Sequence, residues 1–179
     1  MADQQIRFGT DGWRGVISDN FTFKNVARVA QAIADFYSRG QGIKIAVGFD
    51  TRFLSEKYAA IVSRVLADNG IAVQLSDRAI PTPALSFAVN RGGMTAGVMI
   101  TASHNPSGFN GFKLGLNKTT IYGQEIQEVY DVIERGEFAV GKGKVSKSDV
   151  IKPYSDRIKK EFHFKKKQIV THSFRVACG

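Results

Sequence analysis

The stretch AGVMITASHNPSGFNGFKLGL, residues 96–116, contains two apolar runs with a polar loop between them. Residues 96–100 form a short apolar run that is typical of a buried strand. A polar loop rich in Gly and Pro follows, and residues 112–116 form a second run. About ten residues separate the two runs, which is too few for the helical crossover that joins parallel strands. We therefore predict that the second strand is antiparallel to the first and lies at an edge of the sheet.

The chain on either side of this stretch alternates between strands and helices. Runs rich in β-branched residues predict two further strands, at 43–49 and 71–75. Apolar residues at helical spacing predict four helices, at 21–40, at 55–70 with Ser55 as N-cap, at 82–92 and at 123–136. Strands joined by helices lie parallel, with the helices on both faces of the sheet. The sequence therefore predicts an α/β fold whose first three strands are parallel and whose fourth is antiparallel at the edge.

The loop between the two opening runs concentrates polar side chains. Ser103 follows almost directly on the end of a predicted parallel strand, where open α/β sheets bind their ligands. His104 and Asn105 follow it, and Lys113 stands at the start of the next strand. Backbone N–H groups and a cation stabilise phosphate, and a histidine can move protons near neutral pH. These residue types predict an anion site in the loop.

Spacing excludes several familiar sites. Ser103 is flanked by Ala102 and His104, so it does not stand in the Gly-x-Ser-x-Gly pattern of serine hydrolases. No Gly-x-x-x-x-Gly-Lys-[Ser/Thr] motif occurs, and the glycines of residues 9–15 lack the dinucleotide-binding spacing. An ordinary turn whose polar groups satisfy only the backbone stays the alternative to an anion site.

The composition is typical of a soluble globular protein. The apolar fraction is 43% and the charged fraction 23%. No apolar run approaches the roughly 20 residues that span a bilayer. The N-terminal residues MADQQIRFGT show no leader pattern, and the single Cys178 has no partner for an internal disulfide. We expect a cytoplasmic protein with no membrane partner.

The positive charge is concentrated at the end of the chain. Residues 141–179 hold 11 of the 25 Lys and Arg but only 3 of the 16 Asp and Glu, so they carry +8 of the net charge of +9. These lysines and the nearby Phe162 and Phe164 could contact nucleic-acid phosphates. A solvated connector or a surface that meets another domain is the commoner use of such a segment. We therefore do not expect nucleic acid as the partner.

Four motifs carry a resemblance to a known family. They are ITASHNPSGFNGFKL at 100–114, RFGTDGWRGVI at 7–17, VGFDTR at 47–52 and PTPALSFAV at 81–89. Together they resemble the N-terminal, phosphoserine-bearing domain of the α-D-phosphohexomutases, the family of phosphoglucomutase and phosphomannomutase. The resemblance implies a three-layer α/β/α sandwich with a four-stranded mixed sheet, as domain I, over residues 1–150. Residues 151–179 would be a basic connector or a truncated or divergent start of a second domain.

The resemblance also implies roles for individual residues. Ser103 would carry a phosphoryl group, exchange it with a hexose phosphate through a hexose bisphosphate, and supply one ligand of Mg²⁺ through its phosphate. His104 and Lys113 resemble proton-moving residues of the family, and Arg14 resembles a residue that contacts phosphate or sugar. Substrate contacts would come from Arg14, Asn105 and Lys113. The family takes its other metal ligands from three Asp of a later domain, which this sequence does not contain.

Each of these residues also has a purely structural interpretation. His104 could cap its own turn, Lys113 could be a solvated charge, and Arg14 could pair with the aspartate three residues before it. Asp50 and Arg52 follow the strand predicted at 43–49. We expect these two to pair structurally rather than to bind a metal.

Complete members of the family resemble four domains over more than twice this length. We therefore expect the first domain of a Mg²⁺-dependent phosphohexomutase, which interconverts hexose 1-phosphate and hexose 6-phosphate together with C-terminal domains and is inactive alone. Two alternatives stay open at this stage. One is a non-catalytic sugar-phosphate-binding or regulatory module, and the other is a basic nucleic-acid-binding domain.

Overall fold

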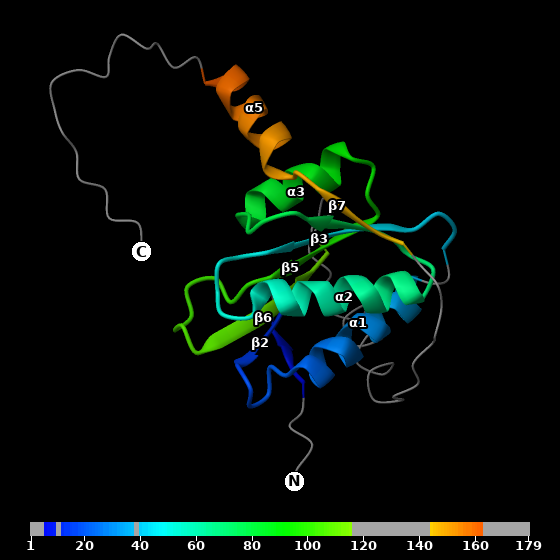
Figure 1. Cartoon of the computed structure of the whole chain (residues 1–179), viewed down its shortest axis with the longest axis vertical. Helices are drawn as coiled ribbons and strands as arrows, with labels where there is room; N and C mark the ends of the chain where they lie inside the picture. Colours follow the sequence, from blue (N-terminus) through cyan, green and yellow to red (C-terminus); the bar gives the residue numbers. More distant parts are fainter. Residues whose placement is uncertain (1–5, 10–11, 38–39, 116–143, 163–179) are drawn as a thin grey trace, which may run out of the picture.

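The computed structural model describes residues 6–9, 12–37, 40–115 and 144–162. Within them a mixed sheet has helices on both faces (Figure 1). Helices α1 (Phe23–Tyr37) and α2 (Ser55–Asp68) cover one face, and α3 (Thr82–Arg91) covers the other. Helix α5 (Ile151–Glu161) packs against α3 and extends beyond the sheet. The helix predicted at 123–136 lies outside the described residues.

The sheet has seven strands in the order β1-β2-β6-β5-β3-β4-β7. Their bounds are Phe8–Gly9 for β1, Gly12–Val16 for β2, Lys44–Phe49 for β3, Ala72–Ser76 for β4, Ala96–Ile100 for β5, Phe109–Leu114 for β6 and Val145–Ser148 for β7. Strands β5, β3 and β4 are parallel neighbours, which confirms the prediction for the first three strands. Strand β7 adds a fourth parallel strand beside β4, whereas β6, β2 and β1 are antiparallel.

Two features of the predicted sheet were wrong. The sheet has seven strands rather than four, and β6, although antiparallel to β5 as predicted, is not an edge strand because β2 pairs with its other side. The missed strands lack the apolar runs that indicate burial. Strand β2 reads GWRGV, with two glycines, and the edge strand β7 reads VSKS and is largely exposed. Both join the sheet through backbone hydrogen bonds, which the side-chain pattern does not report.

Alternation along the strands divides the core into two clusters. Ile45 and Val47 of β3 face α1 and α2, whereas Ala46 between them faces α3. On the α1 side the buried Trp13 ring stacks on Phe21, with ring centroids 4.6 Å apart. The single tryptophan of the chain therefore lies in the core.

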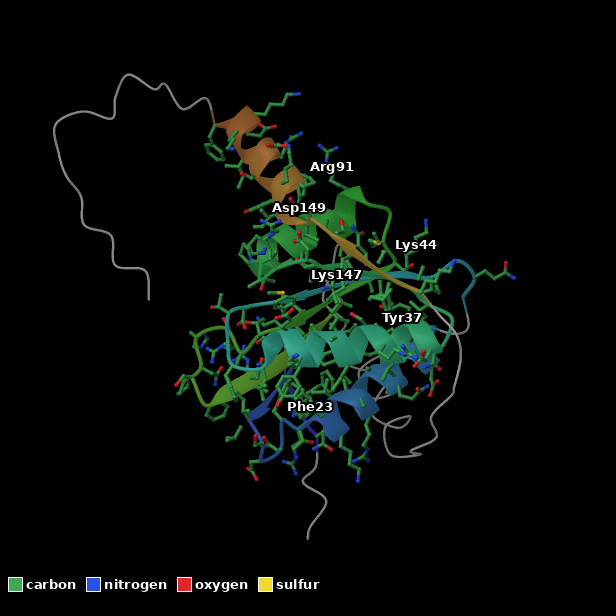
Figure 2. The ribbon with its side chains drawn as sticks, in the orientation of Figure 1. Phe23, Tyr37, Lys44, Arg91, Lys147 and Asp149 are labelled. Atoms are coloured by element: carbon green, nitrogen blue, oxygen red, sulfur yellow. The ribbon has the colours of Figure 1, made fainter. Side chains whose placement is uncertain are left out.

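The segment after β7 is fastened to the α3 face of the sheet. Val150, Ile151 and Tyr154 pack in the same cluster as the apolar side chains of α3. The Asp149 side chain, which lies where β7 leads into α5 (Figure 2), accepts hydrogen bonds from the backbone N–H groups of Ile151 and Lys152 at 3.1 and 3.0 Å. Among the described helices, none is both long and apolar enough to cross a membrane.

Candidate functional site

The loop that carries Ser103 begins at the carboxyl end of β5, beside the carboxyl end of β3. The chain leaves β3 through α2 on one face of the sheet and enters β5 through α3 on the other face. The ends of β3 and β5 therefore form the switch point where open α/β sheets bind ligands. Two loops meet there, one after each strand.

Ser103 stands in this loop with a left-handed backbone, at φ +56°. A non-glycine residue in this region carries a backbone cost of about 1 kcal/mol or more, and such residues cluster at functional sites. The Ser103 N–H donates to the Thr101 hydroxyl oxygen at 3.0 Å, which anchors the turn. The Ser103 hydroxyl is exposed and lies 3.5 Å from Nδ1 of the exposed His104. The structure thus brings the serine and the histidine together at the surface.

Arg52 joins the loop after β3 to the Ser103 loop. Its guanidinium donates to the carbonyl oxygens of three loop residues, Ser103 at 2.8 Å, Asn105 at 2.5 Å and Pro106 at 2.9 Å, and to that of Phe109, the first residue of β6, at 3.1 Å. Its Nε lies 3.5 Å from the Asp50 carboxylate, which confirms the predicted pair. The contacts to the loop could not be predicted from the sequence, because their partners lie more than fifty positions away along the chain.

Arg14 reaches the same loop from the opposite direction. It lies on β2, opposite Gly111 of β6, and its Nη1 donates to the Asn105 side-chain oxygen at 3.0 Å. The aspartate that the sequence offered as an alternative partner, Asp11, lies outside the described residues. The structure therefore brings two of the predicted substrate-contacting residues, Arg14 and Asn105, into direct contact.

Lys113 lies further along β6, opposite Met99 of β5 rather than beside Ser103. Because Arg14 is opposite Gly111, Lys113 and Arg14 are diagonal neighbours on one face of the sheet. Such neighbours lie roughly 7–8 Å apart, within reach of two long side chains. Arg14 and Lys113 therefore place two cations on the same side of the sheet, of which Arg14 contacts the loop.

Gly111 permits the close approach of β6 to the loop. Its carbonyl accepts a hydrogen bond of 2.9 Å from the N–H of Thr101. A Cβ at position 111 would lie 2.5 Å from the Thr101 carbonyl oxygen and 3.2 Å from Cγ of Arg14. A larger residue would therefore push the Ser103 loop and Arg14 apart.

A buried amide fixes the two loops from beneath. Asn110 is fully buried, and its Nδ2 donates to the Ser55 hydroxyl at 2.9 Å and to the Phe53 carbonyl at 3.3 Å. The Ser55 hydroxyl in turn donates to Asp50 at 2.8 Å. The expected N-cap role of Ser55 was wrong, because Leu54 holds the cap position, at φ +64°, and Ser55 is the first helical residue. Its hydroxyl serves the loop network instead.

The described residues do not form a metal site by themselves. Mg²⁺ prefers oxygen ligands, chiefly carboxylates, phosphates and water. No group of three His, Cys, Asp or Glu side chains that could hold an ion occurs in the part of the chain that the structure describes. The chemistry there suits Mg²⁺ only through the oxygens of a phosphate on Ser103, so further ligands would have to come from elsewhere.

The exposed Ser103 thus lies in a loop that two arginines hold, Arg52 through backbone carbonyls and Arg14 through Asn105, at the switch point of an α/β/α domain. The family model for phosphoglucomutase/phosphomannomutase, alpha/beta/alpha domain I, matches residues 5–140. The chain therefore belongs to the phosphohexomutase family of enzymes and contains the family's N-terminal domain.

Individual relatives agree with this assignment. The chain is 34% identical to a phosphoglucomutase of Staphylococcus saprophyticus over 175 residues, covering 86% of this chain and 31% of the relative. It is 33% identical to a phosphomannomutase/phosphoglucomutase of Pseudomonas aeruginosa, covering 93% of this chain and 35% of the relative. A solved phosphoglucomutase/phosphomannomutase family protein of Burkholderia thailandensis matches with a TM-score of 0.73 and 29% identity, covering 82% of this chain and 34% of that one. The chain thus spans about a third of the length of these relatives.

Proposed function

We propose that Ser103 carries the phosphoryl group of a Mg²⁺-dependent phosphohexomutase that interconverts hexose 1-phosphate and hexose 6-phosphate through a hexose bisphosphate. One observation carries the proposal: Ser103 stands exposed in a left-handed turn at the switch point of the sheet, next to His104. Membership of the phosphohexomutase family supports it. The activity belongs to the whole protein, of which this domain supplies the phosphoryl carrier.

In the transfer step, the bond between phosphorus and Ser103 Oγ breaks, and a bond between phosphorus and a sugar hydroxyl oxygen forms. The hydroxyl gives up its proton, and the released serine oxygen takes one up. His104 is the candidate proton carrier beside Oγ, since its Nδ1 lies 3.5 Å away. Arg14 and Lys113 would bind the phosphate of the sugar, and Asn105 would hold Arg14 in place.

The exposure of Ser103 suits storage of the phosphoryl group better than its transfer. Phosphate monoesters hydrolyse very slowly without a catalyst, so an exposed phosphoserine persists in water. Transfer requires positive charge at the phosphoryl oxygens and exclusion of water, and Mg²⁺ would supply the charge when bound. We expect C-terminal domains to provide the remaining metal ligands and to close over the loop.

The test joins this chain to the remaining domains of the Pseudomonas aeruginosa relative and incubates the product with glucose 1,6-bisphosphate and Mg²⁺. We expect the intact mass to rise by one phosphoryl group, and peptide mapping to place that group on Ser103. The Ser103→Ala variant should stay unmodified and lack mutase activity. Ser107→Ala removes only the hydroxyl of another exposed serine in the same loop and keeps its backbone N–H, so it is the matched control and should behave like the parent protein.

The same experiment distinguishes a non-catalytic module. Such a module would bind hexose phosphate, measured by calorimetry, without any phosphorylation of Ser103. That result, obtained with a folded protein, would contradict the proposed function.

A further inference from the structure

We propose that Arg52 is a positioning residue for phosphoryl transfer, which holds the Ser103 loop in its reactive conformation without touching the phosphate. This inference rests on the proposed function of Ser103. Four observations carry it: the use of the arginine's donors, the direction of the loop's peptide groups, the anchoring of Arg52 by Asp50, and the left-handed backbone of Ser103.

The hydrogen bonds of Arg52 leave none of its donors for a ligand. A guanidinium has five N–H donors in a fixed planar arrangement. Nη1 donates to Pro106 and Phe109, and Nη2 donates to Ser103 and Asn105. The remaining donor, on Nε, faces the Asp50 carboxylate at 3.5 Å. Arg52 therefore acts on the loop rather than on a bound anion.

The same bonds determine which way the loop presents its backbone. The described peptide bonds are trans, so the carbonyl and the N–H of one peptide unit point in opposite directions. The Arg52 guanidinium donates to the carbonyl oxygens of Ser103 and Pro106. The N–H groups of the same two peptide units, which belong to His104 and Ser107, therefore point away from Arg52. Neither N–H has a hydrogen-bond partner within the described part of the chain. Arg52 thus keeps carbonyl oxygens away from a phosphoryl group and leaves N–H donors available.

Arg52 itself is anchored on the sheet side. Oδ1 of Asp50 accepts hydrogen bonds from the Arg52 backbone N–H at 3.0 Å and from the Ser55 hydroxyl at 2.8 Å. The Arg52 side chain is only 15% exposed. A side chain fixed at both ends can keep Ser103 at its unfavourable φ of +56°. Without it, the loop can relax to ordinary backbone conformations, and the serine oxygen moves from its position.

The test uses Arg52→Lys in this chain and in the joined protein described above. Lysine keeps the charge but loses the planar array of donors. The matched control is Arg64→Lys, the same substitution in an exposed arginine that pairs with Asp68 on α2. If Arg52→Lys lowers the yield of folded protein, Asp50→Asn provides a second variant, because it removes the charge that faces Nε and keeps an oxygen for the other two bonds.

We expect Arg52→Lys to lower kcat on the order of 100-fold, the effect of a displacement of about 1 Å, with KM for the hexose phosphate unchanged. Amide hydrogen exchange of residues 103–109 should accelerate while exchange in α1 and α2 stays as in the parent chain. Asp50→Asn should also lower kcat and accelerate exchange of residues 103–109, but by smaller amounts than Arg52→Lys. Arg64→Lys should change neither kcat nor the exchange rate. A parent-like kcat in Arg52→Lys, or a rise in KM alone, would overturn the proposal.

The two proposals fail in different ways. If the joined parent protein is not phosphorylated at Ser103, the proposed function fails. Amide hydrogen exchange in this chain then still tests whether Arg52 holds the loop. If the parent protein is phosphorylated and Arg52→Lys transfers phosphate at the parent rate, only the role of Arg52 fails.

Discussion

Nη1 of Arg14 donates a hydrogen bond of 3.0 Å to the side-chain oxygen of Asn105, across 91 positions of the chain. This bond connects an antiparallel strand at one side of the sheet to the loop at the end of a parallel strand. Both residues are half-buried. The contact fixes the Ser103 loop on the side opposite to Arg52.

We expect the Arg14 and Asn105 side chains to be energetically coupled. A double-mutant cycle of Arg14→Met and Asn105→Ala, measured by urea unfolding of this chain, should give a coupling free energy of about 1 kcal/mol. Either single substitution already removes the shared hydrogen bond, so the double variant should lose less stability than the sum of the two single losses. Strictly additive losses would show that the bond contributes nothing to the fold.

The left-handed backbone of Ser103 should be visible in stability. Glycine adopts this conformation without the steric cost of a Cβ. The free energy of unfolding of Ser103→Gly should therefore be about 1 kcal/mol higher than that of Ser103→Ala. Urea titration measures the difference. The same pair of substitutions at Ser107, which has no positive φ, should show no advantage for glycine. Equal stabilities of the two Ser103 variants would contradict the strained turn.

Removal of the buried Asn110 amide should destabilise the chain. Asn110→Ala leaves the Ser55 hydroxyl and the Gly111 N–H without their bonds to this side chain, and it should lower the free energy of unfolding by about 2 kcal/mol. The exposed Asn90, which donates only to the Ser86 carbonyl, is the control. Asn90→Ala should cost less than about 0.5 kcal/mol. Equal losses at the two sites would contradict the bracing role of Asn110.

An ion pair near the end of β4 should make stability depend on pH. The hydrogen bond from Arg78 lowers the pKa of the exposed Asp77 below its ordinary value of 3.8. A lowered folded pKa stabilises the folded chain above pH 3.8, and this contribution disappears as the pH falls through the folded value. The melting temperature of Arg78→Gln should lie below that of the parent chain at neutral pH and approach it in acid or high salt. A gap that does not change with pH would refute this.

This chain alone should not complete the mutase reaction. The described residues hold no cluster of metal-ligating side chains, and Ser103 is exposed to water. We expect no conversion of glucose 1-phosphate to glucose 6-phosphate by the purified chain, measured with a coupled dehydrogenase, whereas the joined protein should be active. Measurable turnover by residues 1–179 would contradict the need for further domains.

Sequence reasoning predicted those parts of the fold that depend on local pattern. The three parallel strands and the helices α1, α2 and α3 follow from apolar periodicity, which reports how each segment is buried. Apolar periodicity did not indicate strands β1, β2 and β7. A glycine-rich or polar strand joins a sheet through backbone groups that every residue carries, so no side-chain pattern marks it.

The position of Ser103 after a buried parallel strand follows from the sequence, because strand burial and loop length are local properties. The surroundings of Ser103 follow from the tertiary structure alone. Arg52 could have been an exposed cation, Ser55 a simple helix cap and Arg14 the partner of its neighbour. The order of the strands in the sheet determines which carbonyl oxygens accept hydrogen bonds from Arg52 and which amide accepts one from Arg14. That order is decided by the packing of the whole chain, which brings together residues 51 to 91 positions apart.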